Sequence, residues 1–467
     1  MSNEKSKAKE MSEKLFYTKK SVFEHKDDAH FEKALEYAKG YAAYLDAAKT
    51  EREAVKESIR LAELQGFVPY ALGDKVVAGG KYYYNNRGKA LYLFTIGSES
   101  IENGMRISAA HIDSPRIDLK QCPLYEEGGM SFFKTHYYGG IRKYQWVATP
   151  LALHGVVAKK DGTVVEVNVG EDETDPVFYI NDLLPHLGQE QSKKPLGEAI
   201  PGEKLNVLIG SRPFDNSGDS DMIKLQTMVL LNEKYGITED DFLSAELCVV
   251  PAFKARDIGF DRSLVGAYGH DDRVCAYPAL SAIFENANSA HTLMCVLADK
   301  EETGSDGTTG MKSDVFLDLI NELSTALGAD PAKVRANSKC LSADVSASFD
   351  PNFPDVFEKR NTPLLSAGVV LTKFTGSRGK SGTNDASAEY IGWLRRVMED
   401  EGIVWQAGEL GKVDCGGGGT VAKFIAEHNI ETVDLGVPVI SMHAPYEAIA
   451  KVDLYEAYRA FCAFCRA

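Results

Sequence analysis

The stretch TLMCVLADKEETGSDG, Thr292 to Gly307, opens with apolar and β-branched residues and then places Glu301 and Glu302 at the edge of a glycine-rich loop. Its first half is typical of a buried β-strand. Two adjacent carboxylates repel each other, and neither is stable in a buried position without a partner. A positive centre that uses both would explain why a buried strand ends on them, so we expect further ligands elsewhere in the chain.

Four other segments place a metal-binding side chain next to an apolar run. RISAAHID, KCLSAD and VPVISMH end such a run on or near His111, Asp344 and His443, and GHDDRVCAYPALSAIF begins a helical pattern with Asp271 and Asp272. In open α/β sheets, ligands bind beyond the carboxyl ends of the strands. We therefore expect these segments and the glutamate doublet to meet at one edge of a sheet.

Each segment has an ordinary interpretation when it is taken alone. A single histidine is usually a surface or satisfied core residue, an Asp-Asp pair often begins a helix, and adjacent glutamates often form a solvated face. Five segments with mutually compatible ligands favour a site over five coincidences.

The residue types of this cluster restrict its chemistry. Two histidines and three carboxylates, with no cysteine, suit zinc first and manganese or cobalt next. A carboxylate can bridge two ions ~3.5–4 Å apart, and paired ions activate water beside a polarised carbonyl. We expect two divalent ions per subunit, with Glu302 as a ligand and Glu301, turned the other way, as the general base. Asp113 could accept a hydrogen bond from the free N–H of His111 and fix its tautomer.

The chain alternates strands with helices on both sides of a segment of different texture. That alternation predicts an α/β fold with a mainly parallel central sheet flanked by helices. The middle segment contains short, turn-punctuated strands such as FFKTHYYGG and LALHGVVAKKDGTVVEVNVG, which are typical of a β-rich module. We predict a catalytic domain in two parts, residues 1–118 and 248–467, interrupted by a β-rich domain at residues 119–247. A monomer would expose the aromatic strands of this insert, so we expect it to carry subunit contacts.

Composition and charge exclude several classes of partner. The 467 residues carry a formal net charge of −16, which argues against a nucleic-acid surface. No apolar run reaches the ~18 residues of a membrane-spanning helix, and the charged start MSNEKSKAKEMSEKLFYTKK has no signal-peptide core. We expect a cytoplasmic protein whose eight scattered cysteines are small buried residues. CAFC, Cys462 to Cys465, has redox spacing, but its terminal helical context favours a structural role.

Six motifs follow one another along the chain: AAHIDSPRIDLK, GHDDR, DKEETGSDG, SADVSASFDP, CGGGGTVAKFIA and VISMHAPYE. With these motifs in this order, the chain from Gly79 to its C-terminus resembles the aminopeptidase I/aspartyl aminopeptidase family of di-zinc exopeptidases. The resemblance implies a zinc-exopeptidase α/β domain, an inserted β-barrel-like module, and assembly as a homo-dodecamer that acts on peptides.

The resemblance also implies roles for single residues. Asp271 would bridge two metal ions, and the peptide bond between Asp271 and Asp272 would be cis. The remaining ligands would be His111, Glu302, Asp344 and His443, with Glu301 as the base and Asp113 behind the ligands.

The chain departs from the family pattern in two places. In better-known relatives, a G-x-W-H-x-W segment of the insert supplies a histidine to a neighbouring subunit's active site. The corresponding run here, YYGGIRKYQWVATP, has no histidine, and His136 is only a nearby stand-in. HAPYE also differs from the usual S-I-R-E ending. Neither departure touches the expected ligands.

The substrate-binding candidates are less specific. Lys373, with Arg378 and Lys380 in the same segment, corresponds to a family lysine that faces an acidic substrate side chain, although a solvated loop charge is equally ordinary. Gly417 and Gly418 in CGGGGT allow close backbone approach to the first substrate side chain, or they form a structural turn. No G-K-[ST] follows, so a phosphate loop is not favoured. His270, beside Asp271, is interpreted as loop structure because the ligand set is already complete.

The sequence therefore predicts a metal-dependent aminopeptidase that removes the N-terminal residue of peptides, with a possible preference for acidic first residues. A carboxypeptidase or deacylase on the same two-metal scaffold is the first alternative, because it would use the same ligands. A catalytically silent assembly protein is the second, and it would be recognised by a missing ligand or base. Here all six positions are filled.

Overall fold

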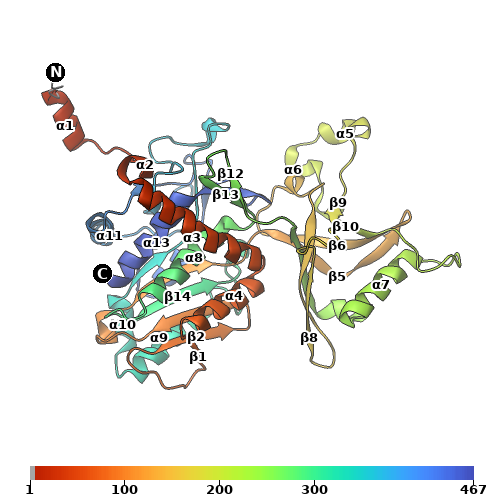
Figure 1. Cartoon of the computed structure of the whole chain (residues 1–467), viewed down its shortest axis with the longest axis horizontal. Coiled ribbons are helices and arrows are strands. Elements are labelled where there is room, and N and C mark those ends of the chain that lie inside the picture. Colours follow the sequence, from red (N-terminus) through yellow and green to blue (C-terminus); the bar gives the residue numbers. More distant parts are fainter. Residues whose placement is uncertain (1–5) are drawn as a thin grey trace.

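The computed structural model describes residues 6–467; residues 1–5, the beginning of the charged N-terminal stretch, lie outside the described residues. Figure 1 shows two groups of elements. A layered body of sheet and helices carries both ends of the chain, and a mostly β group with strands β5 to β10 stands to its right.

The layered body is built on a nine-stranded sheet with the order β1-β2-β3-β14-β4-β15-β21-β17-β19. Its strands are β1 (Val68–Pro69), β2 (Lys81–Asn86), β3 (Ala90–Thr95), β14 (Leu293–Ala298), β4 (Arg106–His111), β15 (Lys339–Ser342), β21 (Glu431–Gly436), β17 (Val369–Thr372) and β19 (Trp405–Ala407).

This sheet is mixed, with five parallel and three antiparallel strand pairs. The central strands β14, β4, β15 and β21 pair in parallel. The β2–β3, β3–β14 and β17–β21 pairs are antiparallel. The short link from β2 to β3, residues 87–89, permits only a hairpin, because a parallel pair needs a long crossover.

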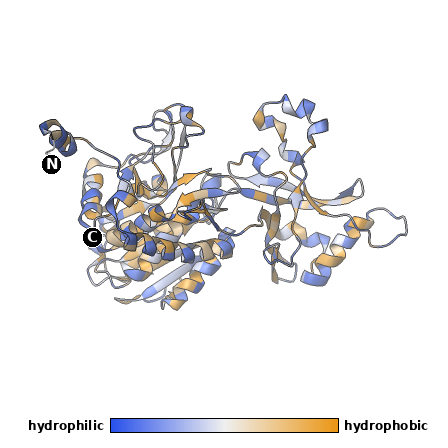
Figure 2. Ribbon diagram, turned by 45° about the horizontal axis from the view of Figure 1, so that its top comes forward, coloured by the Kyte–Doolittle hydropathy of each residue, from blue (hydrophilic) through white to orange (hydrophobic). Residues whose placement is uncertain are grey.

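Helices cover both faces of the nine-stranded sheet. In β3, whose residues are all buried, Leu91 and Leu93 pack in one hydrophobic core while Tyr92 and Phe94 pack in the other. This alternation follows from the two-residue repeat of a strand. The first core contains α3 (Asp28–Ala47), α4 (Glu51–Leu64), α8 (His270–Glu285), α11 (Ala388–Asp400) and α13 (Lys451–Arg466). The second contains α9 (Val315–Ala326), α10 (Pro331–Asn337) and α12 (Ala422–Ala426). Figure 2 shows hydrophobic and hydrophilic residues mixed along the helices of the layered body.

The second group is a seven-stranded antiparallel sheet with the order β8-β7-β11-β5-β6-β10-β9. Its strands are β5 (Arg116–Glu127), β6 (Met130–Tyr138), β7 (Leu151–Ala158), β8 (Val164–Val169), β9 (Tyr179–Ile180), β10 (Val207–Gly210) and β11 (Ala245–Pro251). Within residues 6–467, β8 and β9 end the sheet without pairing to each other, so its closure as a barrel stays a prediction. The sheet begins at Arg116 and ends at Pro251. That this region is an inserted domain stays a prediction. The helices of this group are α5 (Gln189–Ser192), α6 (Leu196–Ala199) and α7 (Met222–Tyr235).

A five-stranded sheet, which the sequence did not predict, lies in the order β12-β13-β23-β22-β16. Its strands are β12 (Arg256–Ile258), β13 (Leu264–Ala267), β23 (Glu447–Ala450), β22 (Pro438–Ile440) and β16 (Ser346–Ala347). A separate pair joins β18 (Gly376–Ser377) to β20 (Gly417–Gly418). The short helices α1 (Lys7–Leu15) and α2 (Val22–His25) precede the first core helix. The 3-10 helices are η1 (Ile101–Asn103), η2 (Lys143–Gln145), η3 (Pro185–Leu187), η4 (Gly202–Lys204), η5 (Glu239–Ser244), η6 (Glu301–Thr303) and η7 (Pro354–Val356).

All eight cysteines are free thiols. Cys462 and Cys465 are buried in α13, in agreement with the structural interpretation of CAFC. Cys122 and Cys415 are exposed, so the prediction of buried cysteines is wrong for these two. Among the described helices, none combines the length and the apolar character needed to cross a membrane.

Candidate metal centre

Three of the expected ligand segments follow adjacent parallel strands of the nine-stranded sheet. His111 is the last residue of β4, Glu301 and Glu302 begin η6 shortly after β14, and Asp344 follows β15. β14 and β15 both pair with β4 in parallel. Their carboxyl ends therefore lie at one edge, as expected for a ligand site in an open α/β sheet.

The other two segments come from the five-stranded sheet, so the expectation of a single sheet edge is wrong. Asp271 follows β13 at the beginning of α8, and His443 follows β22. β21 and β22 are separated only by Val437, and the chain passes there from one sheet to the other. The peptide bond between Asp271 and Asp272 is cis, as the resemblance implies.

Asp271 lies at the middle of the cluster. Its Oδ1 is 3.1 Å from Nε2 of His111, and its Oδ2 is 3.1 Å from Nε2 of His443. Two groups of potential ligand atoms share this residue: His111, Asp271 and Asp344 form one, and Asp271, Glu302 and His443 form the other, with all atoms of a group within 4.8 Å of one another. Both groups include the Asp271 carboxylate, so the cluster could hold a metal ion beside this residue.

Backbone carbonyls fix the tautomers of both histidines. Nδ1 of His111 lies 2.9 Å from the carbonyl oxygen of Asp113, and Nδ1 of His443 lies 2.9 Å from that of Gly140. A carbonyl only accepts, so each Nδ1 carries the hydrogen. Each Nε2 lone pair then faces an oxygen of Asp271, which requires a proton or a metal ion between the two acceptors.

The donor set fits a divalent cation. Oδ1 of Asp271 and Oε1 of Glu302 are buried without a hydrogen-bond partner among the described residues. Burial and the charge of Asp271 raise the pKa of Glu302, and burial and the charge of Asp272 raise that of Asp344. Burial opposes protonation of His443, but Asp271 outweighs it and raises the pKa of His443 to about 10. This excess of buried acceptors is relieved by positive charge.

The glutamate doublet divides between two environments. The side chain of Glu302 is 4% exposed and its Oε1 lies 3.6 Å from Nε2 of His443. That of Glu301 is more exposed, at 18%, and its Oε2 lies 4.0 Å from Nε2 of His111; both glutamates line the cavity described below. Burial, together with the charges of Asp271 and Asp113, raises the pKa of Glu301 to about 7. Glu301 thus faces the space that a substrate would enter.

Asp113 supports the doublet more directly than the sequence predicted. Its carboxylate accepts hydrogen bonds from the amides of Glu301 at 3.1 Å and Glu302 at 3.2 Å, and from the hydroxyl of Tyr138 at 2.6 Å. Oδ1 of Asp113 lies 3.4 Å from Nδ1 of His111, whereas the backbone carbonyl oxygen of Asp113 lies 2.9 Å from the same nitrogen. The carbonyl therefore orients His111, and the carboxylate holds the doublet.

The seven-stranded sheet reaches this centre through the segment that follows β6. The hydroxyl of Tyr138 donates to Asp113, and the carbonyl oxygen of Gly140 lies beside Nδ1 of His443. A Cβ on Gly139 would lie 3.3 Å from Glu302. His136, considered as a stand-in for the missing histidine, is exposed, and its Nδ1 lies 2.8 Å from the carbonyl of Tyr137.

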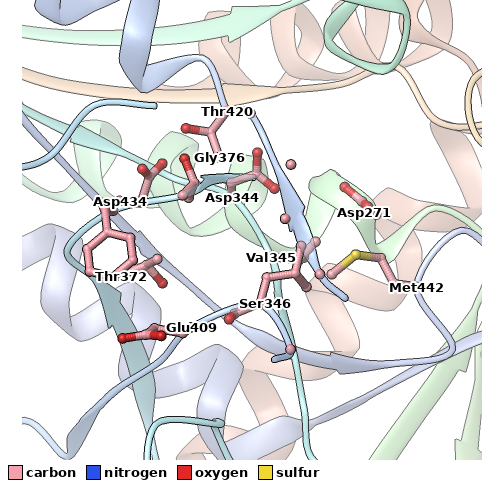
Figure 3. Close-up of a pocket in the computed structure, with 18 of the residues that line it drawn as sticks. Asp271, Asp344, Val345, Ser346, Thr372, Gly376, Glu409, Thr420, Asp434 and Met442 are labelled. Carbon is pink, nitrogen blue, oxygen red and sulfur yellow. The ribbon is translucent and has the colours of Figure 1, made fainter. Parts of the chain in front are cut away.

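A cavity of about 420 Å³ opens beside the cluster and is lined by the five expected ligands and Glu301. Figure 3 shows Asp434 and Thr372 at one end of it and Asp271 at the other. Gly417 and Gly418 also line the cavity. Gly417 has φ 131° and a Cβ there would lie 2.2 Å from the carbonyl of Gly376, so glycine is required by the β18–β20 pairing itself.

The three basic candidates for substrate binding line two different cavities. Arg378 and Lys380 line the cavity, whereas Lys373 lines a different hollow with Tyr17 and Trp405. Lys373 forms an ion pair with Asp385. Lys380 also pairs with Asp385, at 2.8 Å.

Three buried acids around the centre lie outside the expected ligand set; sequence reasoning missed Glu447 and Asp434 and named Asp272 only beside Asp271. Glu447 accepts hydrogen bonds from the amides of His443 and Asp271. Asp434 lines the cavity and accepts from Ser342 at 2.7 Å. Both oxygens of Asp272 are buried without a partner among the described residues. A carboxylate inside an apolar run, as in VDLGVPVI, is the only sequence signal that marks Asp434.

His270 is held by Tyr41, whose hydroxyl lies 2.7 Å from Nδ1, and by the Val265 carbonyl 3.1 Å from Nε2. Both ring nitrogens are thus engaged within the fold, in agreement with the structural interpretation of this residue.

The family model described as aminopeptidase I zinc metalloprotease (M18) matches residues 44–465. The probable M18 family aminopeptidase 1 of Clostridium acetobutylicum is 49% identical over 453 residues, which cover 95% of this chain and 97% of that protein. The crystal structure of an M18-family aminopeptidase from Thermotoga maritima has a TM-score of 0.92 at 42% identity and covers 97% of this chain and 100% of that one. The yeast mApe1 dodecamer has a similar fold, with a TM-score of 0.74 at 20% identity over 91% of this chain and 95% of that chain.

Proposed function

The chain belongs to the M18 family of aminopeptidase I zinc metalloproteases and is a metalloaminopeptidase, and from this premise we propose that it works with two divalent ions, zinc in the first place. Asp271 with His111 and Asp344 would hold one ion, and Asp271 with Glu302 and His443 would hold the other. The observation that carries this proposal is the position of the Asp271 carboxylate, whose two oxygens each lie 3.1 Å from a different imidazole Nε2.

The chain's own residues then divide the work of peptide hydrolysis. When bound, the ions polarise the scissile carbonyl and lower the pKa of a water molecule. Glu301, which faces the cavity, takes the proton of the attacking water and passes it to the leaving amine. Asp113 holds the amides of the doublet, and the carbonyls of Asp113 and Gly140 keep the two imidazoles in the ligating tautomer.

The deciding experiment compares peptides with free and acetylated N-termini on protein reconstituted with zinc. We expect release of the first amino acid from free peptides and none from acetylated ones. Release of the last residue would identify a carboxypeptidase, and release of acetate would identify a deacylase. If none of the peptides gives a product, the protein is catalytically silent. Each of these three results contradicts the proposal.

We further propose a preference for acidic first residues. Arg378 supports it, because this cation lines the cavity and has no ion-pair partner among the described residues. Lys380 is already paired with Asp385, and Glu409 and Asp434 oppose a stronger preference. Arg378→Ala should lower kcat/KM on Glu- and Asp-terminated peptides and leave Leu-terminated ones unchanged. An equal change on all three peptides excludes Arg378 from specificity.

Finally, we propose a closed homo-oligomer of twelve chains with contacts made by the insert. Large apolar side chains are exposed there, among them Leu183, Leu184, Leu187 and Leu196. Such clusters usually mark interfaces. The mass of the particle in solution tests this: a stable, active monomer contradicts the assembly without affecting the metal assignments.

A further inference from the structure

We propose that Glu447 is a positioning residue of the metal centre, whose carboxylate holds the backbone of two ligands at once. One oxygen accepts a hydrogen bond from the amide of His443 at 2.7 Å, and the other accepts one from the amide of Asp271 at 3.1 Å. Glu447 is 2% exposed. The inference rests on the proposed function, because it takes Asp271 and His443 as ligands.

The topology explains why one residue can reach both segments. β23, which begins with Glu447, lies between β13 and β22 in the five-stranded sheet and is antiparallel to both. The start of β23 therefore lies beside the ends of its two neighbours. Asp271 follows the end of β13, and His443 follows the end of β22. The distance between the two ligands is thus set across three hydrogen-bonded strands.

The turn that carries His443 needs such a restraint. Ser441 has φ 61° and His443 has φ 64°, both in the left-handed region that L-residues avoid. The hydrogen bond from the His443 amide to Glu447 opposes relaxation of this turn. Relaxation would carry the His443 ring away from Asp271, because the ring is directed by the same backbone.

A carboxylate is the side chain that this position requires. It offers two acceptor oxygens and no donor, and it meets two backbone donors. A glutamine of the same shape offers one acceptor and brings an NH2 group against the second amide, which leaves a buried donor without a partner. Glu447→Gln therefore breaks the restraint on one ligand segment with almost no change in volume.

The experiment measures metal binding, not turnover alone. Metal-free wild-type and Glu447→Gln proteins are titrated with zinc against a chelator, and with cobalt followed by its visible absorption spectrum. We expect the ion held by Asp271, Glu302 and His443 to bind about 10–100-fold more weakly, the usual cost of losing a partner behind the ligands. The cobalt spectrum should change as well, because ligand geometry changes.

Asp453→Asn is the matched control. Asp453 is also buried, and its carboxylate accepts two backbone amides, those of Ser366 and Gly368, both at 2.7 Å, neither of which belongs to a proposed ligand. This variant should lose thermal stability but bind both ions as the wild type does. Equal loss of metal in both variants would show that Glu447 acts only through general stability, and would overturn the inference.

Further variants separate the possible failures. His443→Ala should remove the same ion as Glu447→Gln weakens; if it binds two ions normally, the ligand assignment of the proposed function fails. If His443→Ala loses the ion but Glu447→Gln binds both with wild-type affinity, only the positioning role fails. If the glutamine variant does not fold, Glu447→Asp takes its place in the same test, because the shorter side chain cannot reach both amides. In the wild type, amide exchange at Asp271 and His443 as fast as in exposed loops would also overturn the role.

Discussion

His111 in the metal centre and His154 in β7 are each 1% exposed; His111 lies beside three carboxylates and His154 beside two. His154 belongs to a set that we term the junction cluster, with Lys49, Glu53 and Glu171. Its Nδ1 lies 2.7 Å from Glu53 and its Nε2 lies 3.0 Å from Glu171. Glu53 also completes the capping box that begins α4.

The pKa shifts of the carboxylates have opposite signs in the two places. Burial disfavours the charge of Glu53 and Glu171, but the hydrogen bonds with His154 outweigh it and lower both pKa values. In the centre, burial and the Asp271 charge raise the pKa of Glu302. The junction cluster contains enough positive charge for its acids, and the metal centre does not.

Lys49 supplies part of this positive charge, to Glu171. Its ammonium group lies 2.6 Å from Glu171 and also donates to the carbonyls of Pro251 and Phe253. Both nitrogens of His154 face carboxylates, whereas each centre histidine uses Nδ1 on a carbonyl and turns Nε2 to Asp271. Similar residue types thus make a closed ion cluster in one place and an open cation site in the other. The position of acceptors without partners distinguishes them, and composition does not.

The largest expected effect comes from removing the shared ligand. Asp271→Ala should weaken both ions together, because one carboxylate serves both sites, and activity should fall below detection. Metal analysis after dialysis measures this. Glu53→Gln, which alters the junction cluster, should keep both ions. Retention of one ion at normal affinity in Asp271→Ala would move the bridge elsewhere, with Asp272 as the next candidate.

Glu301→Gln should keep both ions and lose about 10²–10⁴-fold in kcat, the usual cost of removing a general base. The carboxamide retains the shape of the side chain but cannot accept the proton. Metal content and kcat are measured on the same preparation. A loss of less than about tenfold at full metal content would contradict the base assignment.

Sequence reasoning found the ligand candidates because four of the five stand at or just after a strand that is largely buried, whereas Asp271 was found at the start of a helical pattern. β4 and β14 are buried at every residue, and their candidate ligands, His111 and Glu302, stand at or just after the end of each strand. This signal is local, and it survives without knowledge of which sheet a strand joins. The fold class could be predicted for the same reason.

The five-stranded sheet could not be predicted, because its strands are two to four residues long. Such runs are too short to show a period. Glu447 was hidden with them, since its role depends on strands that are far apart in sequence. The role of Lys373 stays a prediction: this residue lines a different cavity, and Arg378 and Lys380 of the same segment line the one beside the candidate ligands.

Lys49→Met tests the closed cluster, with a smaller expected effect. The methionine keeps the aliphatic stem and removes the ammonium, which leaves Glu171 and two carbonyls without this donor. We expect a loss of roughly 3 kcal/mol, the lower end for a broken buried pair, because Glu171 is 18% exposed and keeps His154. Urea denaturation measures it.

Lys56→Met is the matched control, because its pair with Glu166 joins the same two regions but is 69% and 67% exposed. It should change stability by less than about 1 kcal/mol. Both variants should bind metal normally. Equal loss in the two lysine variants would mean that burial of Lys49 adds nothing to its pairing.

The smallest effect concerns pH, and it distinguishes the two histidine environments without touching a ligand. Burial lowers the pKa of His154, but the hydrogen bonds to Glu171 and Glu53 outweigh it and raise the pKa above its ordinary value of 6.5. A raised histidine pKa stabilises the fold fully below pH 6.5, and that contribution is lost as pH rises through the folded-state value. The lowered values of Glu53 and Glu171 act in the other direction, stabilising above pH 4.5 and failing on acidification. The side chain in the His154→Gln variant cannot be protonated. The variant should therefore be less stable than the wild type by the largest amount near pH 6, and this deficit should shrink as pH rises. The metal centre is the same in both proteins, so its own titration cancels from this difference. Urea midpoints of the two proteins measured from pH 5.5 to pH 9 provide the comparison, and a deficit that stays constant over this range would mean that His154 is neutral in the folded protein.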